Sequence, residues 1–382
     1  MDAASFASIL RTLRRKRGYT QNELAERAGL SVRTISDLER GIKASPRLAT
    51  VRLLGSALEG GADELATLLA AATPDHQRDP ARAQLRSEEL PDASSTIHLD
   101  IRYARRTDGA RTAYGVTGRG PSLLIPPGLI SHLEWYETAP GIGRWLSSLA
   151  RNRTLVLYDR HGCGLSDRDR SDFTAIDDMR DIEAVAETLA TGSFDVFGSS
   201  WGTHPAIMFA ARYPHRVRRL LLYAPTLLHS PAGASVGSTV RSARLQGSIV
   251  DRRLALAALR RTDLELYVRT VAMMFFPDDA DSDLFWSFVS HLRTAATIEM
   301  QEQLDLVQFD LEPLLEKISS PTLVTHRRGD RACPFEIGQY IAARISGARF
   351  VPLEGQSHFP WVGDWQSVAD VIREFLDAAP VV

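Results

Sequence analysis

Residues 198–202 read Gly-Ser-Ser-Trp-Gly and place a serine between two glycines directly after an apolar run. The run Phe194–Phe197 predicts a buried strand, and the segment after Gly202 predicts a helix, so Ser200 is expected on the sharp turn between them. Glycines allow such a turn and keep bulky side chains away from the serine. A serine exposed in this way is suited to nucleophilic attack, and Ser200 is therefore the candidate nucleophile.

A serine hydroxyl needs a base, and two later segments supply a base and an acid. In SPTLVTHRRGDRACP an apolar run ends in a polar loop with Asp330, and in VPLEGQSHFPWVGDW another ends in a loop with His358. We expect His358 to accept the Ser200 proton while Asp330 orients the imidazole and stabilises its charged form. Glu354 and Asp364 are alternative acids, although neither follows a strand so clearly.

Stabilising a negatively charged reaction intermediate requires backbone N–H donors near the serine. The amide of Trp201 is the first expected donor. The second should come from the loop after the apolar run Leu123–Ile125, which reads Pro126-Pro127-Gly128-Leu129. Prolines carry no N–H, and of the two remaining residues we favour Leu129.

The other histidines and the cysteines fit other roles better. His161 is expected to shape its loop, and His204, one turn beyond Ser200, to pack in the core, while His132 is equally compatible with lining the pocket or not. Cys163 lacks an acid and a base at comparable spacing. With Cys333 it completes the cysteines of the chain, which match neither a disulfide framework nor a zinc pattern. No metal site and no organic cofactor are predicted.

Positioning these residues requires a sheet whose strands end at one edge. Short apolar runs alternate with helical segments after residue 96, which predicts a mostly parallel sheet with helices on both faces. The expected strands are an initial hairpin of Ile97–Tyr103 and Thr112–Val116, followed by Leu123–Ile125, Leu155–Tyr158, Phe194–Phe197, Leu220–Tyr223 and Leu323–Thr325.

Residues 97 to about 380 resemble the α/β-hydrolase superfamily. The segments IPPGLISHLEW, LYDRHGCGLSDR and TLVTHRRGDRACP are similar to hydrolase-like domains that accompany bacterial adenylate cyclase or LuxR-type modules. The resemblance implies a triad in the chain order serine, aspartate, histidine. Many catalytic members have His-Gly in the oxyanion loop, whereas this chain has Pro127-Gly128, which keeps a backbone donor but lacks a bracing side chain.

The superfamily places a helical cap after the sixth strand, and residues 226 to about 316 interrupt the strand–helix alternation in that position. We expect these residues to cover Ser200 and to favour an apolar or aromatic ligand. Most of the following side chains are expected to form the cap core, with some facing the pocket: Met273, Met274, Phe275, Phe276, Phe285, Trp286 and Phe288.

The first seventy residues have a different, helical pattern. Apolar residues at helical spacing predict a helix over 6–17, and Thr20-Gln21-Asn22-Glu23 is a capping box that begins a second helix, Gln21–Ala28. Gly29 then supplies a turn, and Ser31 caps a third helix that runs to about Arg40. The string TQNELAERAGLSVRTISDLERG resembles the helix-turn-helix of the Xre/Cro family, over roughly residues 5–72.

That resemblance implies that the third helix lies in the major groove of double-stranded DNA. Arg33 has the best chemistry for a bidentate guanine contact, while Asp37 accepts from a cytosine amino group or pairs with Arg33 or Arg40 on the helix. A helical bundle used only for dimerisation is the alternative. The expected DNA-contacting residues are Ser31, Arg33, Thr34 and Asp37 near the bases, and Gln21, Ser36 and Arg40 near the phosphates.

Composition fits this division. The 382 residues are 44% hydrophobic, enough for one large and one small core. Residues 1–70 hold eleven Lys or Arg and eight Asp or Glu, a net charge of +3, whereas the rest carries −5. We expect a DNA-binding domain at 1–72, a Pro-rich linker at 73–95 and a hydrolase domain at 96–382. Because no long apolar run and no signal peptide are evident, we expect a cytoplasmic chain without membrane contact.

Together these patterns predict a DNA-binding regulator, acting as a homodimer, whose α/β-hydrolase domain senses a small ester or lactone, with hydrolysis of that ligand left open. Two other hypotheses stay open. In the first, the chain is an ordinary esterase or lactonase and its helix-turn-helix serves only tethering or dimerisation. In the second, the hydrolase domain is a receptor that binds its ligand without turnover.

Overall fold

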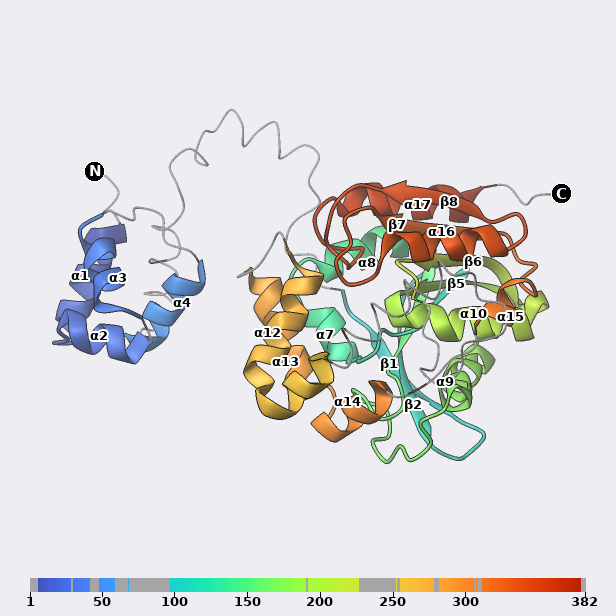
Figure 1. Ribbon diagram of the computed structural model, residues 1–382, viewed down its shortest axis with the longest axis horizontal. Helices are drawn as coiled ribbons and strands as arrows, with labels where there is room; N and C mark the ends of the chain where they lie inside the picture. Colours follow the sequence, from blue (N-terminus) through green and yellow to red (C-terminus); the bar gives the residue numbers. More distant parts are fainter. Residues whose placement is uncertain are drawn as a thin grey trace. The chain divides into compact units, whose positions relative to one another are not determined.

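A computed structural model of the chain describes residues 6–28, 30–41, 48–58, 68, 97–189, 192–226, 252, 255–277, 282–305, 307 and 311–378. The chain divides into two compact units, drawn mainly from residues 1–92 and 93–382 (Figure 1). The predicted linker at 73–95 and the turn at Gly29 lie outside the described residues. The domain boundaries at 72 and 96 therefore stay predictions.

The smaller unit consists of short helices around one apolar core. Phe6, Leu10, Leu24, Ile35 and Leu38 are buried together with residues of the fourth helix. This core explains the helical spacing of apolar residues in the sequence, because each helix turns one stripe inward. The helices are α1 (Phe6–Lys16), α2 (Gln21–Ala28), α3 (Val32–Glu39) and α4 (Leu48–Ala57).

Both predicted helix caps are present. The Glu23 amide donates to the Thr20 hydroxyl at 3.2 Å, and the Thr20 amide donates to a Glu23 carboxylate oxygen at 2.7 Å, which confirms the capping box. Ser31 accepts from the Thr34 amide at 3.1 Å at the start of α3. These caps fix where α2 and α3 begin.

The larger unit is built on one eight-stranded sheet with the order β1-β2-β4-β3-β5-β6-β7-β8. Strand β2 pairs antiparallel with β1 and β4, and the remaining neighbours are parallel, which confirms the mostly parallel sheet. The strands are β1 (Asp100–Arg105), β2 (Arg111–Gly118), β3 (Ser122–Ile125), β4 (Thr154–Tyr158), β5 (Phe194–Ser199), β6 (Val217–Tyr223), β7 (Thr322–Arg327) and β8 (Arg349–Leu353).

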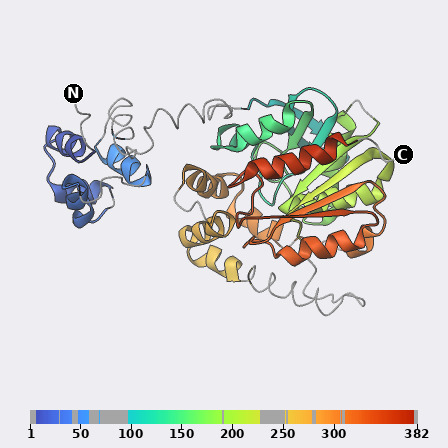
Figure 2. The ribbon, with the colours of Figure 1, turned by 90° about the horizontal axis from the view of Figure 1, so that it is seen from above.

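Helices cover both faces of this sheet. In β4, Leu155 and Leu157 point into one apolar core with α8 and α17, whereas Val156 and Tyr158 point into a second core with α9, α10 and α16. Figure 2 shows α17, in dark red, beside α8 on one side of the strands, with orange α16 on the other. The helices are α8 (Ile142–Ala150), α9 (Ala175–Thr188), α10 (Thr203–Arg212), α16 (Phe335–Arg344) and α17 (Trp365–Asp377), with the short η3 (Pro214–Arg216) before β6.

Helices also fill the interval between β6 and β7, where the cap was predicted (Figure 1). Phe276, Phe285 and Phe288 are buried there, as expected for a cap core, but Met273 is 57% exposed, so its assignment to that core was wrong. Met273 lies on the outer side of an amphipathic helix whose inner side carries Val268 and Val271. The cap helices are α12 (Leu264–Phe275), α13 (Asp283–Thr294), α14 (Ile298–Asp305) and α15 (Glu312–Leu315), and α7 (Leu133–Thr138) follows β3.

None of the helices in the described ranges is both long and apolar enough to cross a membrane.

Candidate active site

Ser200 lies on a strained turn between β5 and α10. Its φ of 54° is in the left-handed region that non-glycine residues seldom adopt, and it begins the short helix η2 (Ser200–Gly202). A Cβ on Gly198 would meet the Gly202 carbonyl oxygen at 2.7 Å, and a Cβ on Gly202 would meet the Pro126 carbonyl oxygen at 2.5 Å. Close backbone approach thus requires both glycines, and the packed backbone around the turn holds Ser200 in its strained conformation at the tip.

Asp330 and His358 meet although 28 residues separate them. The Nδ1 atom of His358 lies 2.8 Å from a carboxylate oxygen of Asp330, and both side chains are buried. A carboxylate only accepts, so this contact places the neutral-state proton of His358 on Nδ1. The opposite nitrogen, Nε2, is buried and makes no hydrogen bond within the described part of the chain. It is left as an unprotonated acceptor, which is the state that a general base needs.

A second histidine, His326, contacts the same carboxylate and was missed by sequence reasoning. Its Nε2 lies 3.3 Å from Asp330 and 3.1 Å from the Cys333 carbonyl oxygen, both of which accept. Burial alone would raise the pKa of Asp330, but contacts with His358 and His326 hold the pKa of that carboxyl well below its usual range. Asp330 is therefore a fixed negative charge. The position of His326 four residues before it, at the end of β7, is the signal that sequence reasoning could have used.

The predicted oxyanion residues, Leu129 and Trp201, both line the cavity that contains Ser200. An arginine connects them: Arg160 donates to the Leu129 carbonyl at 3.2 Å, and its guanidinium lies 5.4 Å from the centre of the Trp201 ring. Asp178 holds this guanidinium through two of its nitrogens. Arg160 therefore braces the loop that contains Pro127 and Leu129.

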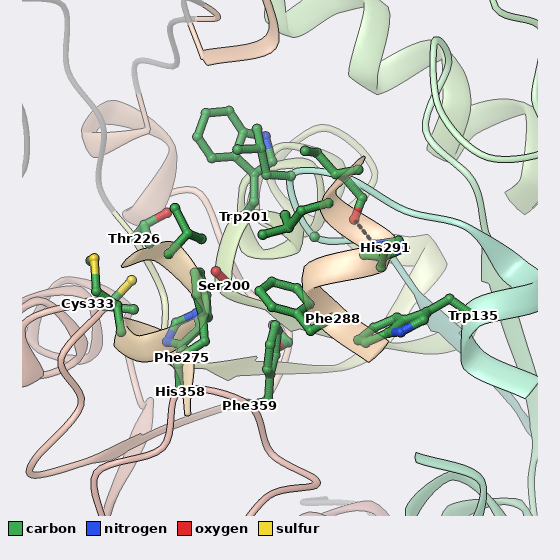
Figure 3. Close-up of a pocket in the computed structure, with 18 of the residues that line it drawn as sticks. Trp135, Ser200, Trp201, Thr226, Phe275, Phe288, His291, Cys333, His358 and Phe359 are labelled. Atoms are coloured by element: carbon green, nitrogen blue, oxygen red, sulfur yellow. Dashed lines mark hydrogen bonds between the residues drawn. The ribbon is translucent and has the colours of Figure 1, made fainter. Parts of the chain in front are cut away.

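Ser200 and His358 face one cavity of about 220 Å³ beneath the cap (Figure 3). No hydrogen bond joins the two side chains among the described residues. No described residue of the lining carries a carboxylate, and the charged side chains there are Arg252 and Arg260. Aromatic rings dominate the rest of the wall, among them Trp135, Trp145, Phe275, Phe288, Phe359 and Trp361. Such a lining suits an apolar or aromatic ligand.

The sequence profile described as the alpha/beta hydrolase fold matches residues 121–362, more than half of the chain. The chain belongs to the α/β-hydrolase family. Curated members similar to it include a pyrrolizixenacetamide deacetylase from Xenorhabdus hominickii, 26% identical over 70% of this chain and 95% of that protein. A pimeloyl-[acyl-carrier protein] methyl ester esterase from Neisseria meningitidis is 27% identical over 52% of this chain and 62% of its own length.

Solved structures show the same fold for the α/β-hydrolase domain. The enol-lactonase from Burkholderia xenovorans LB400 superposes with a TM-score of 0.59 at 20% identity, covering 72% of this chain and all of that structure. A hydrolase from Pseudomonas aeruginosa PA01 gives a TM-score of 0.60 at 22% identity, covering 73% and 99%.

His291, from the cap of this α/β-hydrolase domain, is a further cavity residue that the sequence did not indicate. Its ring stacks on Trp135 at 4.4 Å between centroids, and its Nε2 lies 3.4 Å from the Ile130 carbonyl oxygen. Burial lowers the pKa of His291 to about 4, so the imidazole is neutral at neutral pH. His132, for which a place in the cavity wall was left open, is absent from the described lining. His204 packs beneath the turn of Ser200, with its Nε2 in contact with Thr226.

A cluster of buried carboxylates lies behind the loop of His161. Oxygen atoms of Asp177, Asp178 and Asp181 approach one another within 4.8 Å, a spacing that a metal ion could bridge. Arginines already contact them: Arg106 pairs with Asp177 and Asp181, and other guanidinium groups reach Asp178. His161 lies 3.2 Å from Asp177. The cluster therefore anchors the loop that His161 was predicted to shape.

The profile described as helix-turn-helix matches residues 10–65, which include α2 and α3. Along α3, Ser31, Arg33 and Arg40 are exposed, and Thr34, Ser36 and Asp37 are partly so. Asp37 pairs with Arg40 at 2.7 Å. In the chain without DNA, Asp37 therefore makes the ion pair on the helix surface that was one of its two predicted roles.

Gln21, predicted to lie near the DNA phosphates, makes a contact inside the domain. Its side-chain amide donates to Glu39 at 2.8 Å, and Glu39 is also held by Arg14. The Gln21 amide nitrogen is therefore engaged inside the domain, where it helps to neutralise a buried carboxylate. A phosphate contact would use the second hydrogen of this NH₂ group or replace the hydrogen bond to Glu39.

Proposed function

We propose that this chain is a DNA-binding regulator whose α/β-hydrolase domain takes up an apolar ester or lactone and attacks its carbonyl carbon through Ser200. One observation carries the proposal: Ser200, on a strained turn, shares an aromatic cavity with a buried His358–Asp330 pair whose geometry leaves Nε2 as a base. This combination of nucleophile, base and orienting acid is the one that acyl transfer needs.

The residues would act in a fixed order. His358 Nε2 accepts the Ser200 proton as Oγ bonds to the carbonyl carbon, and the Leu129 and Trp201 amides stabilise the negative oxygen. His358 then gives that proton to the leaving alkoxide, which becomes an alcohol, free for an ester and still attached for a lactone, and an acyl group remains on Ser200. Water then attacks the acyl carbon as His358 takes its proton, and His358 returns a proton to Ser200 Oγ as the acid is released. Asp330 stabilises the charged imidazole during both steps.

The relatives support the acyl chemistry of this proposal. They include proteins named as a deacetylase and a methyl ester esterase, and a solved structure named as an enol-lactonase. All three names describe cleavage or formation of a bond to an acyl carbon. The absence of lining carboxylates within the described residues, together with the aromatic wall, favours a neutral or anionic ligand with an apolar body.

For the N-terminal unit, we propose that a homodimer reads two half-sites of double-stranded DNA through α3, with Arg33 at a guanine. The start of α3 carries three hydroxyl groups, from the cap residue Ser31 and from Thr34 and Ser36. We expect these hydroxyls to contact bases or phosphates there. A domain that binds a ligand can alter operator affinity only if the ligand binds the two DNA-binding states with different affinity.

Covalent labelling with a fluorophosphonate probe tests the hydrolase half. The probe should modify Ser200, and Ser200→Ala should abolish the modification, as should His358→Ala. Ser199→Ala is the matched control, since Ser199 is the adjacent serine and also lines the cavity, and it should still be labelled. An unlabelled wild-type chain would leave the receptor without turnover as the better hypothesis.

Operator binding tests the regulatory half. DNA selected from a random pool by the wild-type chain should lose affinity in Arg33→Ala, whereas Arg119→Ala, which removes one exposed arginine from the hydrolase domain, should retain it. Fluorophosphonate-modified protein should then bind the selected DNA with altered affinity. Equal affinity with and without modification would contradict the sensor and favour a hydrolase whose helix-turn-helix only tethers or dimerises.

A further inference from the structure

Arg327, the last residue of β7, is one of the largest fully buried side chains of the protein. Its guanidinium makes four hydrogen bonds, all to backbone carbonyl oxygens of the loop that follows β8. The acceptors are Ser357 and Phe359 at 3.0 Å each, Val362 at 2.6 Å and Asp364 at 3.3 Å. A single side chain thus holds the loop that carries His358 at four points.

The partners of Arg327 are unusual for a buried charge. Within the described ranges no carboxylate lies within ion-pairing distance of its guanidinium. Buried arginines are ordinarily paired with an acid, because an uncompensated charge is costly to remove from water. Here carbonyl dipoles take that role. An arginine buried without an acid indicates that its planar, forked donor set is needed for the shape of the loop.

The loop is also built to admit this side chain. Gly355 has a φ of 112°, and a Cβ added there would lie 3.3 Å from Cδ of Arg327. Backbone hydrogen bonds run alongside: the Arg328 amide donates to Leu353 at 2.8 Å, and the Gly329 amide donates to Gly355 at 3.0 Å. The loops of Asp330 and His358 are therefore joined by backbone contacts on one side and by the guanidinium within.

Two of the four acceptors flank His358 directly. The Ser357 and Phe359 carbonyls belong to the residues immediately before and after it, and one guanidinium nitrogen of Arg327 binds both. Fixing both neighbours fixes the backbone of His358, and hence the point from which its side chain extends. The Nδ1 contact with Asp330 then sets the ring plane.

We propose that Arg327 is a positioning residue for His358, holding the imidazole in register with Asp330 and Ser200 through the carbonyls on either side. The expected change in reaction rate rests on the proposed acyl chemistry, whereas the position of the His358 imidazole does not. Displacing a catalytic group by about 1 Å costs on the order of 100-fold in rate, which is the loss expected when the four carbonyls lose their donor.

Arg327→Met tests this by keeping length and removing all donors. Arg153→Met is the matched control, since Arg153 is also buried and donates to the Leu376 carbonyl and to Asp195 and Asp377, next to the amino end of β4. The full chain is examined at a temperature below the melting transitions of both variants. Two quantities are measured: the rate of fluorophosphonate labelling, and the nuclear magnetic resonance signal of the His358 Nδ1 proton, assigned with His358→Gln.

We expect Arg327→Met to label about 100-fold more slowly than wild type and to shift or lose the Nδ1 proton signal, while Arg153→Met changes neither. Arg327→Lys, with one compact ammonium, should fall between wild type and Arg327→Met, and it replaces the methionine variant if that variant does not fold. Wild-type labelling and an unchanged Nδ1 signal in the Arg327 variants would overturn the proposal. If wild type itself does not label, the acyl chemistry fails and the Nδ1 signal alone decides on Arg327.

Discussion

Replacing Asp330 by asparagine exchanges one carboxylate oxygen for an NH₂ group and moves the proton of the neutral His358 ring from Nδ1 to Nε2. One carboxylate oxygen of Asp330 accepts from the Ala332 and Cys333 amides at 2.8 and 3.0 Å, while the other faces His358 and His326. In Asp330→Asn the amide oxygen must stay with the two backbone donors. The NH₂ group then points at His358 Nδ1, which has to become an acceptor.

The consequence is the wrong tautomer. With Nδ1 accepting, the neutral imidazole of His358 carries its proton on Nε2, and it can no longer take the proton of Ser200. Loss of the correct tautomer costs a serine triad on the order of 10⁴-fold in rate. That factor corresponds to about 5.5 kcal/mol of lost transition-state stabilisation at 25 °C.

The assay is the second-order rate of fluorophosphonate labelling, with hydrolysis of a chromogenic aryl ester as a second readout. Glu354→Gln and Asp364→Asn are controls, because both acids lie in the His358 loop but serve other contacts: Glu354 pairs with Arg328 on the surface, and Asp364 caps α17. Both should label within a few-fold of wild type. Labelling of Asp330→Asn at the wild-type rate, or a large loss in either control, would refute the assignment of the acid.

Three further predictions concern stability. His291→Phe should flatten the pH dependence of the unfolding free energy between pH 6.5 and 4. The unfolded chain takes up this proton near pH 6.5 and the folded chain only near 4, so wild type should lose about 3 kcal/mol on acidification that the variant keeps, as urea titrations would show. Ser200→Gly should abolish labelling yet raise the unfolding free energy by about 1 kcal/mol, also by urea titration, because it relieves the positive φ. Arg14→Met should destabilise the helix-turn-helix by about 3 kcal/mol in calorimetry of the full chain by leaving the buried Glu39 carboxylate without its guanidinium partner, whereas Asp37→Asn should change it by less than about 0.5 kcal/mol.

The fold followed from the sequence wherever burial and secondary structure coincide. Apolar runs of three or four residues became buried strands because a sheet covered on both faces needs apolar side chains on both. The exception is the first strand, which begins at Asp100 and not at Ile97. Ile97 and Leu99 are buried without being part of the ladder, and hydrophobicity alone cannot separate burial from strand pairing.

The grouping of Ser200, Asp330 and His358 at one site could be predicted because each lies in the turn or loop that follows a parallel strand, and parallel strands end at one edge of the sheet. The supporting arginines could not be predicted. In sequence, Arg160 and Arg327 look like ordinary surface charges. Their acceptors include the backbone carbonyls of Leu129 and of residues 357–364, which residues of any type offer, so no residue pattern marks these contacts. His291 was missed for a related reason, since its place beside Trp135 depends on how the cap packs.

The loop of His358 is held from three directions. Asp330 and Arg327 hold it from the end of β7, and the third contact comes from the cap, where the His358 amide donates to the Phe275 carbonyl at 3.1 Å. The Phe275 ring also lies edge-on to the His358 ring at 4.7 Å and stacks on Phe359 (Figure 3). The first two contacts belong to the sheet and do not depend on what fills the cavity. Phe275, however, both forms part of the cavity wall and ends α12, so a ligand that displaces α12 also removes a hydrogen bond from the backbone of His358. Phe275 therefore belongs both to the wall of the cavity and to the support of the His358 backbone.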